Sequence, residues 1–169
     1  MTSWVTVRLV KKISVLLACA LLALPAFAAA PSITARSWVN IEEAPQLENK
    51  VVLVDFWATW CLPCLFKLST MQAYADEFKA GPFALVGVHY ESKSTQIPLY
   101  LRDQEISFPV AIDTGETFKR FSIVVIPTYV LFDKQGNVRF QGNEPPSTEL
   151  IAQLIAEKLP AVSCQLSAQ

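Results

Sequence analysis

The sequence predicts an α/β domain in which helices cover both faces of a mixed central sheet. Segments typical of buried strands alternate with segments of helical periodicity, which indicates parallel strands joined by helical crossovers. Two further strands separated by a short turn predict an antiparallel hairpin near the C-terminal end. The 169 residues are enough for one domain of this kind.

The first strand is predicted over residues 51–57, a run of β-branched and aromatic residues typical of a strand buried on both faces. Apolar residues then recur at intervals of three and four, which predicts one long helix that ends near Gly81. This stripe consists of Leu65, Leu68, Met71, Ala75 and Phe78. Residues 83–90 form a second run of the buried-strand type.

Shorter elements follow. Ser94 or Thr95 is expected to cap a short helix that reaches Gln104 and carries Pro98 in its first turn. A short strand is predicted over residues 109–112 and a helical turn over residues 117–121.

The C-terminal part is predicted as a hairpin followed by a helix. Strands over residues 128–133 and 138–141 flank the turn signal Lys134-Gln135-Gly136-Asn137. Ser147 is expected to cap the last helix. Its apolar face is expected to contain Leu150, Ile151, Leu154, Ile155 and Leu159.

The N-terminal segment has the pattern of an export signal. A basic stretch precedes an uncharged apolar run, and Ala26-Phe27-Ala28 has the small–x–small pattern that signal peptidase recognises. We predict a cleaved signal peptide over residues 1–28 and an exported, periplasmic protein. The alternative is an uncleaved N-terminal membrane anchor, because residues 13–30 are 18 uncharged residues in a row. The predicted organisation is then a flexible lead-in (29–37), one domain (38–160) and a C-terminal tail (161–169).

Composition excludes two classes of protein. Hydrophobic residues make up 52% and charged residues 17%, which excludes a disordered chain. Removing residues 1–28 takes away three of the 14 basic residues and none of the 15 acidic ones, so the exported chain carries a net charge of −4. Without a basic cluster, no nucleic-acid partner is expected.

The chemistry is predicted at Cys61 and Cys64, between the first buried strand and the helix. Two cysteines three residues apart in a first helical turn place both sulfurs on one face, within bonding reach, and Pro63 suits this turn. The positive end of the helix dipole should stabilise a thiolate on Cys61 by about 0.3–1 kcal/mol. Cys61 is therefore the expected nucleophile, and Cys64, one turn further in, is the expected shielded resolving cysteine.

The run VDFWATWCLPC (54–64), with Ile126-Pro127-Thr128 far downstream, resembles thioredoxin-fold proteins. It is most similar to the exported TlpA/ResA-like thiol–disulfide oxidoreductases, over roughly residues 38–159. The resemblance implies a thioredoxin fold with a central strand–helix insertion around residues 83–112. It also implies a redox-active Cys61–Cys64 disulfide in place of any other cofactor, with no metal.

The resemblance implies further site residues. Pro127 corresponds to the cis-proline that packs against the disulfide, and Ile126 to the neighbour that offers backbone groups to the substrate. Asp55 corresponds to the buried acid that exchanges a proton with the inner cysteine. The sequence pattern around Asp55 agrees with this role, since a carboxyl in an apolar strand should have a raised pKa. The alternative is a strand-end Asp55 that reaches water. The remaining expected substrate contacts are Trp60, Leu62, Pro63 and Thr128.

Two positions depart from the TlpA/ResA pattern. Lys67 stands where a glutamate is usual, and Ser69 where a proline is usual. An inward-pointing Lys67 would favour the thiolate, and the alternative is a lysine that faces solvent.

The remaining candidates are His89 and Cys164. His89 is expected to be a strand-end residue with an ordinary hydrogen bond, and a role beside the dithiol is the alternative. Cys164, in the tail, is predicted to be a free or intermolecular thiol. A zinc site built from these two residues and the dithiol is not expected, because zinc usually recruits a second close-spaced ligand pair.

These features predict an exported thiol–disulfide oxidoreductase that reduces protein disulfides. The resemblance implies a membrane electron-transfer protein as its reductant and a role in cytochrome c maturation, copper-site assembly or related repair. Strongly oxidising relatives carry a histidine between the cysteines, and Leu62-Pro63 supplies none. Two alternatives stay open. One is a disulfide oxidant or isomerase, and the other is a non-enzymatic metal- or partner-binding module.

Overall fold

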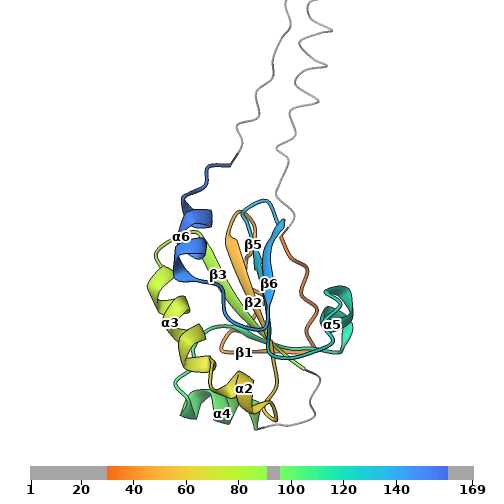
Figure 1. The fold of residues 1–169 in the computed structure, drawn as a ribbon. Coiled ribbons are helices and arrows are strands. Elements are labelled where there is room, and N and C mark those ends of the chain that lie inside the picture. The colour runs from red at the N-terminus through yellow and green to blue at the C-terminus, as the bar shows by residue number, and fades with distance from the viewer. Residues whose placement is uncertain (1–29, 91–95, 160–169) are drawn as a thin grey trace, which may run out of the picture. The chain divides into compact units, whose positions relative to one another are not determined.

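The computed structural model describes residues 30–90 and 96–159. Its strands are β1 (Ser37–Val39), β2 (Val51–Trp57), β3 (Phe83–His89), β4 (Val110–Ile112), β5 (Thr128–Phe132) and β6 (Val138–Gly142). Its helices are α2 (Leu62–Leu65), α3 (Leu68–Phe78), α4 (Ile97–Asp103), α5 (Glu116–Arg120) and α6 (Thr148–Ala156). All elements form part of one α/β domain (Figure 1).

The strands form one mixed sheet in the order β1-β4-β3-β2-β5-β6. β2, β3 and β4 run parallel to one another, and the pairs β1–β4, β2–β5 and β5–β6 are antiparallel. Helical crossovers join the parallel strands, and the last two strands form the hairpin. The predicted fold class and the order of parallel and antiparallel pairs are therefore confirmed.

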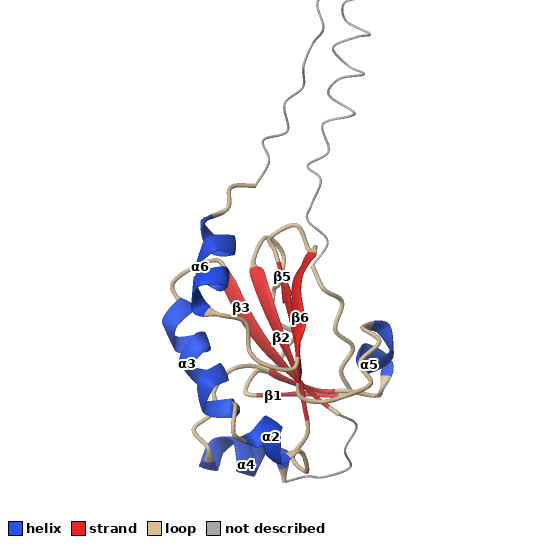
Figure 2. Cartoon of the chain, in the orientation of Figure 1, coloured by secondary structure: helices blue, strands red, loops and turns tan. Residues whose placement is uncertain are grey.

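The two faces of the sheet carry separate hydrophobic cores. α3 and α6 lie on one side of the sheet and α5 lies on the other (Figure 2). Leu53 and Trp57 of β2 belong to the core that contains residues of α3 and α6, whereas Val54 and Phe56 belong to the core that contains Phe118 of α5. Because side chains alternate along a strand, a strand covered on both faces is expected to be apolar at nearly every position, and Asp55 is the one charged residue of β2. Every residue of β2 is accordingly buried.

The prediction of one long helix after β2 is wrong in one respect, because the structure has two helices there, α2 and α3. The amide of Lys67 donates to the carbonyl of Cys64, three residues back, at 3.0 Å. This tight turn ends α2, and α3 begins at the next residue. The apolar stripe continues across the break, so its periodicity alone does not reveal the break.

The segment expected to be a flexible lead-in makes specific contacts. Thr34 exchanges two hydrogen bonds with the Thr117 side chain, at 2.9 and 3.0 Å. The amide of Arg36 donates to Ile112 O at 2.8 Å, and the edge strand β1 follows directly. β1 was not predicted, because three residues are too short to establish a pattern. Residues 30–36 therefore lie along the domain and differ from the flexible segment that was expected.

The last helix begins as predicted and ends earlier. Ser147 Oγ accepts a hydrogen bond from the amide of Leu150 at 3.3 Å, which confirms the cap. α6 ends at Ala156, so the prediction that Leu159 lies on its apolar face is wrong. The ammonium of Lys134 donates to Ile155 O and Glu157 O. A cation at this position satisfies carbonyls that have no partner within the helix.

Pro98 lies in the first turn of α4, as predicted, with Gln96 at the N-cap. The predicted caps Ser94 and Thr95 lie outside the described residues, as do the predicted signal peptide and Cys164. Within residues 30–90 and 96–159, no helix has the length and apolar character needed to cross a bilayer.

Candidate active site

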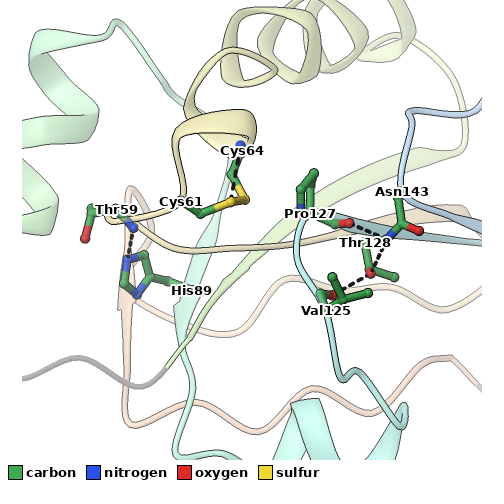
Figure 3. The surroundings of a disulfide bond; sticks show 8 residues. All are labelled: Thr59, Cys61, Cys64, His89, Val125, Pro127, Thr128 and Asn143. Carbon is green, nitrogen blue, oxygen red and sulfur yellow. Dashed lines mark hydrogen bonds between the residues drawn. A yellow bond between two sulfur atoms is a disulfide. The ribbon is translucent and has the colours of Figure 1, made fainter.

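Cys61 and Cys64 form a disulfide at the start of α2, and their Cα atoms are 5.3 Å apart. Cys61 is the N-cap residue, with an extended backbone (φ −93°, ψ 94°). Its Sγ accepts a hydrogen bond from the amide of Cys64 at 3.3 Å (Figure 3). Pro63 lies in the first turn, where no amide donor is needed. The sequence therefore brings both sulfurs together as predicted.

The two cysteines differ slightly in exposure. Cys61 is 6% exposed and Cys64 is 2% exposed. This order agrees with an outer attacking sulfur and an inner resolving one. α2 has only four residues, so its dipole stabilises a Cys61 thiolate less than the dipole of the expected long helix would. The direct hydrogen bond from the amide of Cys64 is the local interaction that would stabilise a Cys61 thiolate.

Pro127 faces the disulfide from a separate part of the chain (Figure 3). The Ile126–Pro127 peptide bond is cis, as the resemblance implied. Ile126 is half-buried, and Val125 before it is 57% exposed. Thr128, expected to contact substrate, is buried, and its hydroxyl donates to Val125 O at 2.7 Å. Its side chain therefore holds the loop that precedes Pro127.

Asn143, just after β6, is a site residue that the sequence reasoning missed. Its Nδ2 donates to Pro127 O at 2.7 Å and to Thr128 Oγ1 at 3.2 Å (Figure 3). An asparagine after a predicted strand looks like an ordinary turn residue, so sequence alone gives no signal for this contact. Asn143 fixes the carbonyl of Pro127 from outside the loop.

Asn143→Ala is expected to raise KM for a peptide disulfide about threefold to tenfold, with a smaller change in kcat. Each lost hydrogen bond contributes roughly 0.5–1.5 kcal/mol to the orientation of the Pro127 loop. Steady-state reduction of the peptide at several concentrations measures this change. Asn137→Ala, in the hairpin turn, is the matched control and should leave KM unchanged. An unaltered KM in Asn143→Ala would show that the loop holds its shape without this side chain.

His89 is fully buried at the end of β3 and holds the loop that leads to Cys61. Its Nε2 accepts a hydrogen bond from the amide of Thr59 at 3.0 Å. Nε2 is therefore unprotonated, and Nδ1 carries the proton that it donates to Tyr90 O at 2.6 Å. Burial lowers the pKa of His89, which keeps the ring neutral. The predicted strand-end hydrogen bond is present, and the ring also reaches the active-site loop (Figure 3).

His89→Phe is expected to cost roughly 1–3 kcal/mol of unfolding free energy at pH 7, because the fully buried ring loses two hydrogen bonds to backbone groups of Thr59 and Tyr90. The pKa of His89 is lower in the folded state than its ordinary value of 6.5. Its contribution is therefore complete above pH 6.5 and is lost as the pH falls below it. Urea unfolding at pH 7 and pH 5 should show that the difference in unfolding free energy between parent and variant is smaller at pH 5. A difference that widens on acidification would contradict a neutral His89.

Asp55 is 2% exposed in the middle of β2. Burial raises the pKa of Asp55 from 3.8 to about 8. The alternative of a strand-end carboxylate that reaches water is therefore wrong. A carboxyl that is mostly neutral near pH 7 and can ionise suits proton exchange.

The two departures from the TlpA/ResA pattern have different surroundings. Lys67 Nζ forms an ion pair with Glu144 at 2.7 Å, and the lysine side chain is 36% exposed. A glutamate is therefore present beside this position, but it comes from the segment after β6. Ser69 is exposed. Lys67 is paired with Glu144 at the surface. It therefore neither points inward to the cysteines nor faces solvent without a partner.

Exposed apolar side chains surround the disulfide. Trp60, Leu62 and Val124 are 68%, 65% and 95% exposed. A pocket of about 270 Å³ is lined by Trp60, Tyr90, Phe118 and residues 123–126. A second pocket, of about 380 Å³, is lined by residues 122–125, Thr128 and residues 141–143. Residues 123–125 of the loop before Pro127 therefore line both pockets.

No cluster of three or more histidine, cysteine or acidic residues that could hold a metal occurs in the described part of the chain. Cys164, one of the residues weighed for zinc, lies outside that part.

Three comparisons with known proteins agree with this geometry. The family model described as the AhpC/TSA family matches residues 24–141. Thiol-disulfide oxidoreductase ResA of Bacillus thuringiensis subsp. konkukian is 29% identical over 97 residues. That match covers 57% of this chain and 56% of the relative, so the chain spans little more than half of it. Sporulation thiol-disulfide oxidoreductase A of Bacillus subtilis is 26% identical over 117 residues, which cover 67% of this chain and 70% of that protein.

Solved structures share the fold. A thioredoxin family thiol:disulfide interchange protein from Chlorobium tepidum superposes with a TM-score of 0.64 and 26% sequence identity. The superposition covers 76% of this chain and 94% of that one. The predicted thioredoxin fold is therefore confirmed.

Proposed function

Because the chain belongs to the AhpC/TSA family and has a thioredoxin-like fold, we propose that it is a thiol–disulfide oxidoreductase that reduces protein disulfides. The observation that carries the proposal is the Cys61–Cys64 disulfide at the start of α2, faced by cis-Pro127. The relatives named thiol-disulfide oxidoreductases support the same activity.

In the proposed reaction, the reduced enzyme attacks with the Cys61 thiolate. The substrate disulfide breaks, a mixed disulfide forms between Cys61 and one substrate sulfur, and the other substrate sulfur leaves as a thiolate that takes up a proton. Cys64 then loses its proton to the Asp55 carboxylate and attacks Cys61 Sγ. The bond between Cys61 and the substrate sulfur breaks, this sulfur leaves as a thiolate that takes up a proton, and the Cys61–Cys64 disulfide remains. Two electrons have passed from the dithiol to the substrate.

Each neighbour has a proposed role in these steps. The amide of Cys64 donates to Cys61 Sγ and stabilises its thiolate. Burial favours the neutral carboxyl, so Asp55 accepts the proton of Cys64 readily when it is ionised. Ile126 offers backbone groups to an extended substrate, and Trp60, Leu62 and Pro63 provide an exposed rim around the sulfurs. The hollows beside residues 122–126 leave room for side chains that flank the substrate cysteine.

The proposed setting is outside the cytoplasm. The N-terminal sequence pattern supports export, with an uncleaved anchor as the alternative. In an oxidising compartment, the Cys61–Cys64 disulfide must be reduced again after each turnover. We assign a membrane electron-transfer protein as its reductant. Cytochrome c maturation or copper-site assembly is the proposed use of the electrons.

The reducing direction is supported by the residues between the cysteines. Leu62 and Pro63 contain no histidine that would stabilise the thiolate and thereby make the disulfide strongly oxidising. A small change in free energy can reverse the preference between reductant and oxidant, because about 30 mV corresponds to about 1.4 kcal/mol for a two-electron couple.

The test is the midpoint potential of the Cys61–Cys64 couple, measured in glutathione or dithiothreitol buffers, together with insulin reduction. A reductant should have a potential close to that of thioredoxin, about −270 mV. A value near about −120 mV would indicate an oxidant instead. Zinc in the purified protein without any reductase activity would indicate the non-enzymatic alternative.

Cys64→Ala should identify the substrate. Without the resolving thiol, the mixed disulfide on Cys61 cannot be released by intramolecular attack. Captured proteins are separated on non-reducing gels and identified by mass spectrometry. The Cys61→Ser/Cys64→Ala double variant is the control and should capture nothing. Equal capture by both variants would show that the adducts do not form on Cys61.

A further inference from the structure

Exposed apolar side chains gather in the pocket of about 270 Å³ beside the disulfide, called the apolar pocket below. Of the nine large apolar side chains that are exposed in the described part of the chain, four line this pocket. The four are Trp60, Tyr90, Val124 and Val125. Single exposed apolar residues are ordinary on a protein surface, whereas a cluster of them around a concave surface marks an interaction site.

Three aromatic rings in contact with one another line the apolar pocket. The ring centroids of Trp60 and Tyr90 are 6.3 Å apart, and those of Tyr90 and Phe118 are 5.1 Å apart, both in edge-to-face arrangements. Phe118 packs in the same way on Phe56 of β2, at 5.1 Å. Aromatic pairs at such distances stabilise each other beyond the area that they bury. The aromatic lining is therefore anchored in the core and is formed before any ligand binds.

The apolar pocket adjoins both halves of the site. Trp60 directly precedes Cys61, and Ile126, which also lines the pocket, directly precedes Pro127. Pro127 in turn faces the disulfide (Figure 3). An extended chain advances about 3.3 Å per residue. A substrate residue one or two positions from a cysteine bonded to Cys61 is therefore within reach of the pocket.

The lining of the apolar pocket discriminates by polarity. Every described residue that lines it has an aliphatic or aromatic side chain. The second pocket, of about 380 Å³, is different because polar side chains contribute to its lining, namely Ser122, Thr128, Gln141 and Asn143. A charged substrate side chain would lose its water in the apolar pocket without gaining a partner. An apolar side chain would instead be removed from water, which favours binding.

We propose that the apolar pocket is a specificity subsite for an aromatic or large aliphatic side chain that lies one or two residues from the substrate cysteine. The inference rests on the proposed function and adds the class of substrate, which is an extended protein segment with an apolar residue beside its cysteine. The occupant is a substrate segment because the pocket is continuous with the place where the mixed disulfide forms. Trp60, Tyr90 and Val124 bind and orient this segment.

The test is the reduction of a set of disulfide-linked peptides by the full chain. The peptides carry Phe, Leu or Ser at one of the two positions on either side of the cysteine. At one position or more, kcat/KM should be about tenfold higher for Phe and Leu than for Ser, which corresponds to about 1.4 kcal/mol. Reduction of the same peptides by dithiothreitol alone corrects for the effect of the neighbour on the disulfide itself. Equal corrected values for all peptides would overturn the assignment.

Two variants connect this preference to the apolar pocket. Val124→Asp introduces a carboxylate at a side chain that is 95% exposed, so the core is left intact. Tyr90→Ala removes the middle ring of the three. Each should lower the Phe-to-Ser ratio from about ten to about three or less. Leu99→Ala, at an exposed apolar residue of α4 outside the lining, is the matched control and should keep the ratio. A ratio that stays near ten in Val124→Asp would contradict the subsite.

A binding measurement separates this inference from the proposed function. The oxidised protein is titrated with peptides in which serine replaces the cysteine, and the amide signals of Tyr90 and Val124 are followed by NMR. A neighbouring Phe should shift these signals, and a neighbouring Ser should shift them much less. If the parent reduces no peptide, the proposed function fails, and the titration still decides the subsite. If the parent reduces all peptides equally, the proposed function stands and the subsite fails. Dimerisation of the parent that Val124→Asp abolishes would place a second copy of the chain in the pocket and overturn the assignment to substrate.

Discussion

Cys61→Ser is expected to abolish insulin reduction, with a loss of at least about a thousandfold. A serine hydroxyl stays protonated at neutral pH and cannot form a disulfide, so neither the attack nor the mixed disulfide is possible. Cys64 cannot substitute, because it is 2% exposed and lies on the inner side of α2. The measurement is the turbidity of reduced insulin in the presence of dithiothreitol.

Cys64→Ser is the matched control for this experiment. It should also fail to turn over, but it should complete the first attack and leave a mixed disulfide on Cys61. Cys61→Ser should leave none. Retained activity in Cys61→Ser, or an adduct on Cys64 in that variant, would reverse the roles of the two cysteines.

Asp55→Asn is expected to change the pH dependence of stability more than any other single substitution. The folded state raises the pKa of Asp55 from 3.8 to about 8, so between these values it binds one proton more than the unfolded state. Stability therefore falls as the pH rises through this range, at up to about 1.36 kcal/mol per pH unit. At pH 8 the oxidised variant should be more stable than the parent by up to about 5 kcal/mol.

Urea unfolding of the oxidised proteins between pH 4 and pH 9 measures this difference. The parent curve should decline across the range, and the Asp55→Asn curve should lack this decline. Asp103→Asn, on the surface of α4, is the control and should follow the parent. The variant should also reduce insulin about tenfold to a hundredfold more slowly, since it has no group to accept the Cys64 proton. Parallel stability curves for parent and Asp55→Asn would show that Asp55 titrates normally.

The fold could be predicted from the sequence because the sheet is covered on both faces. Strands such as β2 and β3 then consist of apolar runs that stand out from their surroundings. The missed features are the ones that local pattern does not encode. β1 has only three residues and exists through its pairing with β4. The break between α2 and α3 lies within an unbroken apolar stripe. The carbonyls at the end of α6 are bonded by Lys134, which comes from the hairpin turn.

The centre of the site could be predicted for a similar reason. Cys61 and Cys64 are close in sequence, and a resemblance over VDFWATWCLPC and Ile126-Pro127-Thr128 implied Asp55 and Pro127. The supporting residues lie far away along the chain. Asn143 reaches Pro127 across 16 residues, and Thr59 is bonded to His89 across 30. Tyr129 comes to lie opposite Asp55 only when β2 and β5 pair.

The connection from β6 to α6, residues 143–147, has a consequence for protein engineering. Surface loops usually accept insertions, but this one makes contacts with two separate segments, the Pro127 loop and helix α3 with its N-cap Lys67. Asn143 binds the Pro127 loop, Glu144 binds Lys67, and Pro146 O binds Tyr74 of α3. One added residue would shift these contacts out of alignment. Tags, grafted epitopes and new chain ends are therefore better placed in the exposed turn at residues 79–82 than in this short connection.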